Sequence, residues 1–359
     1  MNATFGPART APWRDSEPLE CVMVVPEAPN VATFVFRAPS GAWFDYLPGQ
    51  FLTLEIPAES GTVWRTYTIS SSPSRPLSIS ITAKAQPNTS IGTRWMLDNL
   101  APGVRLKAVG PGGLFSTAHH PSPKYLFISA GSGVTPMYSM STFLWDQGTE
   151  PDIVFINAAK RPSEIIFREQ LEHMATRVPG FVVRFVVEEP DRWRAWTGYR
   201  GFFNQLMLGL MAPDYLEREV FCCGPEPFMQ AVRDMLNALG YDMSRYHQES
   251  FQAPIETDGD SPLLDDVVPD AETSAEITFS ASGKVVACTQ TDTVLAVARA
   301  NGLNIPSGCT FGLCGTCKIM KTEGEVHMVH NGGISDEDIE EGYILACCSN
   351  PLGKVVVEV

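Results

Sequence analysis

The chain has 359 residues with a formal net charge of −15, and 44% of them are hydrophobic and 19% charged. This is the composition of an ordinary soluble protein with room for two or three domains, and its negative charge argues against nucleic acid and anionic membrane as partners. The sequence holds no apolar run near the roughly 20 residues that span a bilayer, and its first residues lack the apolar stretch of a signal peptide. We therefore expect a cytoplasmic protein.

Residues 1–17 read as an N-terminal extension, and residues 18–118 as a small antiparallel β-barrel. The barrel is indicated by short apolar segments that are separated by Pro and Gly turns. The expected strands are Cys21–Val25, Thr33–Arg37, Phe51–Ile56, Thr66–Ser70, Leu77–Ala83 and Arg105–Val109.

Residues 119–252 alternate strands with helices, which predicts a doubly wound parallel sheet. The expected strands are Tyr125–Ser129, Asp152–Asn157, Phe181–Glu188 and Glu219–Cys223, and the expected helices are Ile165–Arg177, Glu226–Leu239 and one from Pro136 onward.

Residues 253–275 carry acidic side chains with no Lys or Arg, and they read as a linker. A compact unit, residues 276–359, follows it. The chain is therefore expected to be multidomain.

Four cysteines in the last unit, Cys309, Cys314, Cys317 and Cys347, have the spacing C-x4-C-x2-C followed by a distant Cys. This is the ligand spacing of a plant-type [2Fe–2S] cluster. Cys348 is adjacent to Cys347, but in the plant-type pattern the ligand stands four residues before a Pro, which favours Cys347 because of Pro351.

A strand with the sequence Arg65-Thr66-Tyr67-Thr68-Ile69-Ser70 has the side chains that a flavin requires. Tyr67 offers an aromatic surface, Thr68 or Ser70 a hydroxyl near the ring, and Arg65 a cation. Downstream, Gly92-Thr93-Arg94 opens a helix-like stretch, Trp95–Leu100, where a phosphate would meet free N–H groups. An amphipathic strand with an exposed Arg would give the same pattern.

Two further turns follow strands of the predicted parallel sheet. One is Gly131-Ser132-Gly133-Val134-Thr135-Pro136 and the other is Cys223-Gly224-Pro225. Ligands of open α/β sheets bind outside the carboxyl ends of the strands, so the two turns could face one dinucleotide. The first turn is not G-x-G-x-x-G, and a Gly turn after a strand is often only a turn.

The ordered set R-x-Y-T-x-S, G-S-G-V-T-P-M and C-G-P-x-P-x-M resembles the ferredoxin–NADP⁺ reductase superfamily, here with a C-terminal plant-type ferredoxin domain of β-grasp fold. The resemblance implies a role at the flavin for Arg65, Tyr67, Thr68 and Ser70, and at its phosphates for Gly92, Thr93 and Arg94. It implies a role at the NAD pyrophosphate for Gly131, Gly133, Thr135 and Pro136, and at the nicotinamide for Cys223, Gly224 and Pro225. Glu249 and Phe251 resemble the segment beside the flavin ring. Tyr67, Ser70, Cys223, Glu249 and Phe251 are the candidate catalytic residues.

Residues 215–251 and Val329-His330-Asn331-Gly332-Gly333-Ile334 resemble the reductase components of glycine-betaine-type Rieske monooxygenases. The resemblance implies electron flow from NADH through FAD, with FMN as the alternative, to the cluster and then to a Rieske-type oxygenase that docks at the ferredoxin domain. A flavin suits this path because it accepts two electrons together and gives them up singly.

Three alternatives stay open at this point. Lys160 and Arg161 place two cations where an NADPH 2′-phosphate would lie, although the resemblance favours NADH. The acceptor could instead be a hybrid-cluster protein or an aromatic-ring oxygenase. A redox sensor without turnover would carry the same cofactors.

Overall fold

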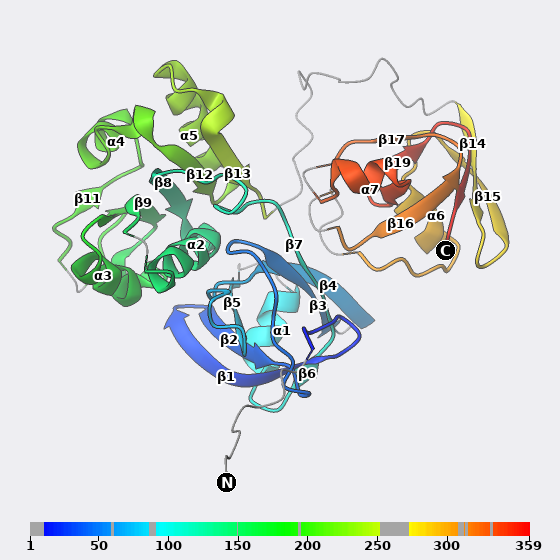
Figure 1. The fold of residues 1–359 in the computed structure, drawn as a ribbon, viewed down its shortest axis with the longest axis horizontal. Coiled ribbons are helices and arrows are strands. Elements are labelled where there is room, and N and C mark those ends of the chain that lie inside the picture. The colour runs from blue at the N-terminus through cyan, green and yellow to red at the C-terminus, as the bar shows by residue number, and fades with distance from the viewer. Residues whose placement is uncertain are drawn as a thin grey trace, which may run out of the picture. The chain divides into compact units, whose positions relative to one another are not determined.

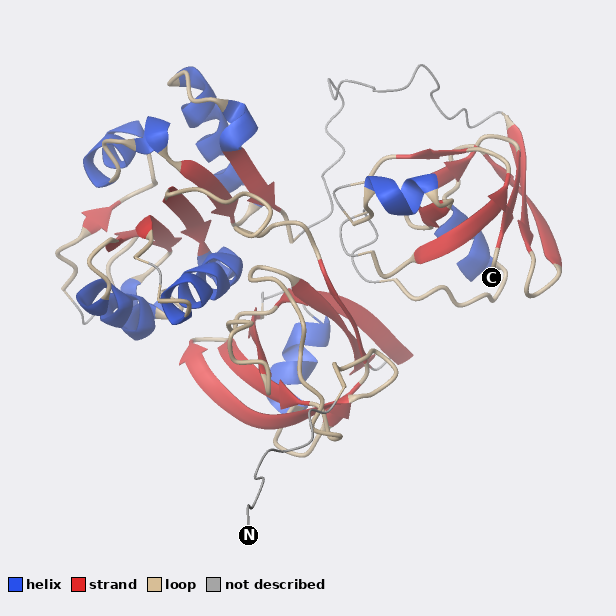
Figure 2. Cartoon of the chain, in the orientation of Figure 1, coloured by secondary structure: helices blue, strands red, loops and turns tan. Residues whose placement is uncertain are grey.

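The computed structural model describes residues 11–58, 61–85, 91–148, 150–192, 195–251, 273–307, 312, 315–330 and 333–359. The chain forms two compact units: the first comprises residues 1–63 and 67–251, and the second comprises residues 64–66 and 252–359. Their elements are labelled in Figure 1, and Figure 2 separates helices from strands by colour. Most of the predicted linker lies outside the described residues.

The N-terminal part of the first unit consists of two antiparallel sheets around one apolar core, as the sequence predicts. One sheet has the order β5-β2-β1-β6 and the other β4-β3-β7. Phe34, Leu54 and Ile81 are fully buried between the sheets, and Met96 of the helix α1 closes the core. The bounds are β1 Leu19–Ala28, β2 Val31–Arg37, β3 Phe51–Ala58, β4 Gly61–Thr68, β5 Ile79–Lys84, α1 Ile91–Asn99, β6 Arg105–Leu106 and β7 Ala108–Gly112.

The second part of this unit is a six-stranded sheet with the order β11-β10-β9-β8-β12-β13, in which every pair is parallel. The chain runs outward from β8 through β9 and β10 and then returns to place β12 on the other side of β8. The two strands therefore flank the topological switch point, where such sheets bind ligands. The strands are β8 Lys124–Ala130, β9 Asp152–Ala159, β10 Phe181–Val187, β11 Tyr199–Arg200, β12 Glu219–Cys223 and β13 Tyr246–Glu249.

Helices cover both faces of this sheet. Apolar side chains of α2 and α3 pack on one face, and those of α4 and α5 pack on the other. The α-helices are α2 Val134–Asp146, α3 Arg168–Arg177, α4 Gln205–Met211 and α5 Glu226–Ala238, and the 3₁₀ turns are η1 Gly131–Gly133, η2 Pro162–Glu164, η3 Tyr215–Glu217 and η4 Met243–Arg245.

The start predicted for α3 is wrong. The helix begins at Arg168 and not at Ile165, because Phe167 has a positive φ of 57° and stacks on Tyr138 with the ring centroids 4.1 Å apart. Burial of this aromatic ring outweighs the helical pattern of the preceding residues. Three shorter elements of this part, α4, β11 and β13, are not predicted at all.

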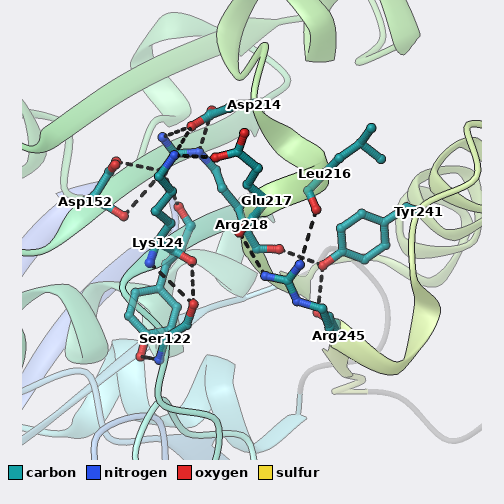
Figure 3. Close-up of polar contacts among 10 residues, drawn as sticks. Ser122, Lys124, Asp152, Asp214, Leu216, Glu217, Arg218, Tyr241 and Arg245 are labelled. Carbon is teal, nitrogen blue, oxygen red and sulfur yellow. Dashed lines mark hydrogen bonds and ion pairs between the residues drawn. The ribbon is translucent and has the colours of Figure 1, made fainter.

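A buried guanidinium ties the amino ends of three strands together (Figure 3). Arg218 is 6% exposed at its side chain and donates to both carboxylate oxygens of Asp214, at 2.7 and 2.9 Å. It also donates to Asp152 at 2.8 Å and to the carbonyl oxygen of Tyr125 at 3.1 Å. These groups satisfy the charge that burial would otherwise leave unpaired.

The second unit contains a five-stranded sheet, β15-β14-β20-β16-β18, and a two-stranded sheet, β17-β19. The helix α6 packs against its core through Val294, Leu295 and Ala298. The bounds are β14 Ser274–Phe279, β15 Lys284–Thr289, α6 Val294–Ala300, β16 Lys318–Glu323, β17 Val326–Met328, α7 Asp336–Glu340, β18 Tyr343–Leu345, β19 Ser349–Pro351 and β20 Lys354–Val357. Among the described helices of the whole chain, none is long and apolar enough to cross a membrane.

Candidate functional site

The predicted flavin strand lies at the edge of the barrel, in and just after β4. Arg65 is exposed, Tyr67 is half-buried, and Thr68 and Ser70 are buried. The hydroxyl of Tyr67 lies 3.0 Å from the hydroxyl of Thr93. The strand and the first turn of α1, which the sequence assigns to ring and phosphates respectively, are thus joined directly.

The first turn of α1 places Gly92 and Thr93 inside and Arg94 outside. Arg94 forms an ion pair with Asp98, one helical turn further on, and also lies 3.4 Å from the amide oxygen of Asn30. This cation is therefore held beside the helix terminus by neighbours of its own domain.

The two Gly turns of the parallel sheet touch each other. A Cβ built on Gly133 would lie 2.2 Å from the carbonyl oxygen of Cys223 and 2.7 Å from the amide nitrogen of Gly224. Gly224 is confined in turn, because its Cβ would lie 3.0 Å from that of Ala130. Glycine is required at position 133 for the turns to meet at the switch point, whereas a side chain at position 224 would require Ala130 or Phe228 to shift.

Gly131 differs from Gly133 because it faces open space. Its φ is +55°, and a Cβ built on it would meet no described atom within 4 Å. It borders a cavity of about 440 Å³, which Pro225 and Phe228 also line. This volume lies within the range of ligand pockets, and open backbone at a helix start suits a phosphate.

Thr135 and Pro136 are buried at the start of α2. The Thr135 hydroxyl donates to the carbonyl oxygen of Ser132 at 3.0 Å. This bond therefore helps to hold the Gly turn in its conformation.

Most residues that line the cavity are absent from the site prediction, among them the charged Lys84, Glu164 and Glu188. Lys84, at the end of β5, reaches across from the barrel and forms an ion pair of 3.1 Å with Glu164. Glu188 follows β10, at the same edge of the sheet as the predicted residues. The strand-end rule could have identified Glu188, whereas no local pattern shows that Lys84 crosses between domains.

The two cations after β9 have different surroundings. Lys160 lines the cavity together with Glu188. Arg161 forms an ion pair of 2.9 Å with Glu189. Each of the two cations that could bind a 2′-phosphate, Lys160 and Arg161, therefore has an acidic residue nearby.

Cys223 and Glu249 are paired in register on the adjacent strands β12 and β13. Burial raises the pKa of the Cys223 thiol well above its usual range, which does not suit a nucleophile. Glu249 is 3% exposed, and within the described part of the chain neither of its carboxylate oxygens has a hydrogen-bond partner. Burial raises its pKa from 4.5 to about 8, so it holds a proton at neutral pH. Phe251 is 42% exposed.

Two of the four predicted cluster ligands are described, Cys317 and Cys347, and both are buried in the core of the second unit. The backbone N–H of Gly312 donates to the Cys347 sulfur at 3.3 Å. N–H groups directed at ligand sulfurs are a feature of iron–sulfur sites. Cys309 and Cys314 lie outside the described residues.

Gly312 and Gly315 allow this loop to approach its neighbours. Both have positive φ, of +75° and +67°, and a Cβ on Gly315 would lie 2.7 Å from the carbonyl oxygen of Gly333. The sulfur of Cys348 lies 3.7 Å from the carbonyl oxygen of Leu345, to which its thiol donates. The two adjacent cysteines thus have different partners: an amide donor for Cys347 and a carbonyl acceptor for Cys348.

Three known families match successive parts of the chain. Residues 22–117 match the family described as an oxidoreductase FAD-binding domain, and residues 127–234 match an oxidoreductase NAD-binding domain. Residues 277–352 match a 2Fe-2S iron-sulfur cluster binding domain. The three cofactors that the sequence predicts therefore each have a domain.

Whole-length relatives share this organisation. The chain is 65% identical to the stachydrine N-demethylase reductase subunit of Rhizobium meliloti, over 96% of this chain and 97% of the relative. It is 46% identical to the glycine betaine monooxygenase reductase subunit of Pseudomonas aeruginosa, over the full length of both. The fold matches that of phthalate dioxygenase reductase with a TM-score of 0.60 and 22% identity, over 95% of this chain and 97% of the other. The chain belongs to the ferredoxin–NADP⁺ reductase superfamily, among the flavin-dependent oxidoreductases that carry a C-terminal 2Fe-2S domain.

Proposed function

We propose that this chain is the NADH-dependent reductase component of a two-component monooxygenase, and that it supplies electrons to a Rieske-type oxygenase that N-demethylates a quaternary amine. The observation that carries the proposal is 65% and 46% identity, along nearly the entire chain, to reductase subunits of stachydrine and glycine betaine systems. The amine itself would bind to the oxygenase and not to this chain.

Residues of the β-barrel and of the parallel-sheet domain would hold the flavin and the nucleotide. Tyr67 would face the flavin ring, with Thr68 and Ser70 near its polar edge and Glu249 and Phe251 on the side of the nucleotide. The phosphate positions would be Arg65, Gly92, Thr93 and Arg94 for the flavin, and Gly131, Gly133, Thr135 and Pro136 for the dinucleotide. Cys223, Gly224 and Pro225 would border the nicotinamide.

The fit of these residues to their ligands rests on open backbone and on an unpartnered carboxyl. Gly131 presents backbone to a cavity that also contains the cation Lys84. Glu249 is buried at the end of β13, beside the strand end of Cys223, and among the described residues its carboxylate has no hydrogen-bond partner. A buried polar group without a partner is costly, so a ligand that supplies one is favoured.

The charges beside the cavity favour NADH over NADPH. Glu188 lines the cavity, and Glu189 already neutralises Arg161. A 2′-phosphate would meet the first carboxylate and would have to displace the second. A ribose diol instead donates hydrogen bonds to a carboxylate.

A bound flavin accepts two electrons together from the nicotinamide and releases them singly. In the second unit, Cys309, Cys314, Cys317 and Cys347 would ligate the [2Fe–2S] cluster, and the Gly312 amide would stabilise charge on the Cys347 sulfur. The oxygenase would dock at this ferredoxin domain. Acidic side chains of the ferredoxin domain, including Glu337 and Asp338 on α7, would attract a basic surface of the oxygenase.

Purified holoprotein tests the proposal in two steps. It should oxidise NADH with cytochrome c as acceptor and should use NADPH far less efficiently. A redox sensor would show no turnover. Mixed with a Rieske oxygenase and then with stachydrine or glycine betaine, it should support NADH-dependent formaldehyde release. Turnover with cytochrome c but with neither amine system would favour a hybrid-cluster protein or an aromatic-ring oxygenase as acceptor.

A further inference from the structure

A row of hydroxyl groups leads from the predicted flavin strand to the rim of the barrel. The Ser70 hydroxyl oxygen lies 2.9 Å from that of Thr82, which lies 2.8 Å from that of Thr33. Thr33 in turn donates to the carboxylate of Glu27 at 2.7 Å. The three hydroxyl residues are 2%, 5% and 8% exposed, and Glu27 is partly exposed.

The strand pleat places these side chains on one face. The barrel core contains the side chains of Ile69, Ile81 and Phe34. Side chains alternate along a strand, so the adjacent residues Ser70, Thr82 and Thr33 point away from the core. The register supports this arrangement, because Thr33 pairs with Thr82 and Ile69 bridges to Ile81. This outer face is the one that meets the nucleotide domain, since β5 lies against η1.

The number of available protons determines which hydroxyl donates and which accepts along the row. A carboxylate only accepts, so the single proton of Thr33 is used on Glu27. Thr82 must then donate to Thr33, and Ser70 must donate to Thr82. The Ser70 proton has one other acceptor, the carbonyl oxygen of Ser80 at 3.2 Å. With this order of donors, the Ser70 oxygen can still accept a hydrogen bond from a group outside the row. The Glu27 carboxylate is the last acceptor, at the opposite end.

The proposed function requires a route of this kind. Each NADH delivers a hydride, which is two electrons and one proton, and leaves as NAD⁺. The two electrons depart singly through the cluster to the acceptor. One proton per NADH is therefore left at the flavin site and must reach solvent.

We propose that Ser70, Thr82, Thr33 and Glu27 form a proton relay from the flavin site to the rim of the barrel. In each passage Ser70 takes up the proton, each hydroxyl passes its own proton to the next oxygen, and Glu27 releases one to water. No electron moves along the row, and the hydroxyls return to their starting state by rotation. The proposal rests on the proposed function.

Glu27 has the surroundings of an exit group. Burial raises its pKa, and hydrogen bonds from Thr33 and Gln170 limit the rise. Burial and, to a smaller extent, the Glu27 charge raise the pKa of Tyr138 on α2, which packs beside it. A carboxylate whose pKa is raised takes up a proton more readily than an ordinary one, which suits a group that accepts a proton from Thr33.

The test is Thr82→Val, which keeps the shape of the side chain and removes the middle oxygen. Anaerobic flavin reduction by NADH should stay within about twofold of the wild type, because the row takes no part in hydride transfer. Proton release, followed with a pH-indicator dye as cytochrome c reoxidises the protein, should slow by about tenfold or more. Thr82→Ser should restore it. Thr176→Val is the control, because its hydroxyl donates to the His173 carbonyl oxygen in α3 and is not part of the row.

A second measurement does not depend on turnover. The infrared carboxyl band of Glu27, assigned by its loss in Glu27→Gln, should titrate at higher pH in Thr33→Val, because a donor to the carboxylate is gone. Glu27→Gln and Thr33→Val should also slow proton release, which keeps the test valid if Thr82→Val folds poorly. Unchanged proton release in these variants would overturn the relay. Failure of NADH to reduce the wild-type flavin would instead overturn the proposed function.

Discussion

Gly133 and Cys223 approach so closely that no side chain fits between them. A Cβ on Gly133 would lie 2.2 Å from the carbonyl oxygen of Cys223. The residues are distant in sequence, but Gly133 follows β8 and Cys223 is the last residue of the neighbouring strand β12. Their contact brings the turns assigned to the pyrophosphate and to the nicotinamide to one edge of the sheet.

Gly133→Ala should therefore damage both stability and nucleotide binding. The obstructing atoms belong to the backbone and cannot rotate away, so we expect a loss of about 1–3 kcal/mol in unfolding free energy. The KM for NADH should rise because the turn is displaced. Urea unfolding and steady-state kinetics measure the two effects. Gly209→Ala in α4 is the control, because nothing lies within 4 Å of its built Cβ; equal behaviour of the two variants would refute the close-contact account.

Arg218→Met should destabilise the protein without changing its chemistry. The substitution removes the buried partner of Asp214 and Asp152. Both carboxylates are partly exposed and Asp214 keeps its ion pair with Lys124, so we expect a loss of about 1–3 kcal/mol from the missing charge-assisted hydrogen bonds. Arg37→Ala removes an exposed pair with Glu20 and should cost less than about 1 kcal/mol. Thermal unfolding compares the variants. Similar Tm values for both would mean that the buried network contributes little.

Glu249 should make stability depend on pH. Its pKa is 4.5 in the unfolded chain and about 8 in the folded one. Between these values the folded state binds the extra proton, so its contribution to stability is complete below the lower pKa and is lost as the pH rises to the upper one. Glu249→Gln should remove this loss. Its Tm advantage over the wild type should grow from about pH 5 to about pH 8; a difference that does not vary with pH would show that Glu249 is already ionised.

Cys347→Ser and Cys348→Ser should differ in cluster content. The first variant loses a proposed ligand and should lose cluster absorbance, iron and acid-labile sulfide, while flavin reduction by NADH continues. The second removes a thiol that donates to the Leu345 carbonyl, and a serine hydroxyl can make the same bond. Iron and sulfide assays decide between them. The opposite outcome would move the fourth ligand to Cys348.

The sequence predicted the elements that carry strong patterns. Most barrel strands and four of the six parallel strands agree with the structure because alternation and turn residues act locally. The strand predicted at Thr66–Ser70 lies earlier, at Gly61–Thr68, and β11 and β13 are not predicted. The remaining features depend on tertiary packing, which the local sequence does not show. Phe167 leaves the helical pattern to stack on Tyr138, and Lys84 gains its place in the cavity only when the two domains meet. The row from Ser70 to Glu27 joins residues of four segments. It depends on how these segments pair with one another, and the sequence of any one segment does not show that pairing.

The most direct test of the central claim is anaerobic mixing of the holoprotein with NADH, followed by optical spectra and freeze-quench electron paramagnetic resonance. The account predicts that flavin absorbance falls first, that the signal of the reduced [2Fe–2S] cluster then appears, and that Cys347→Ser shows only the first phase. Flavin reduction with a cluster that stays oxidised in the wild type would contradict an electron path from NADH to the cluster.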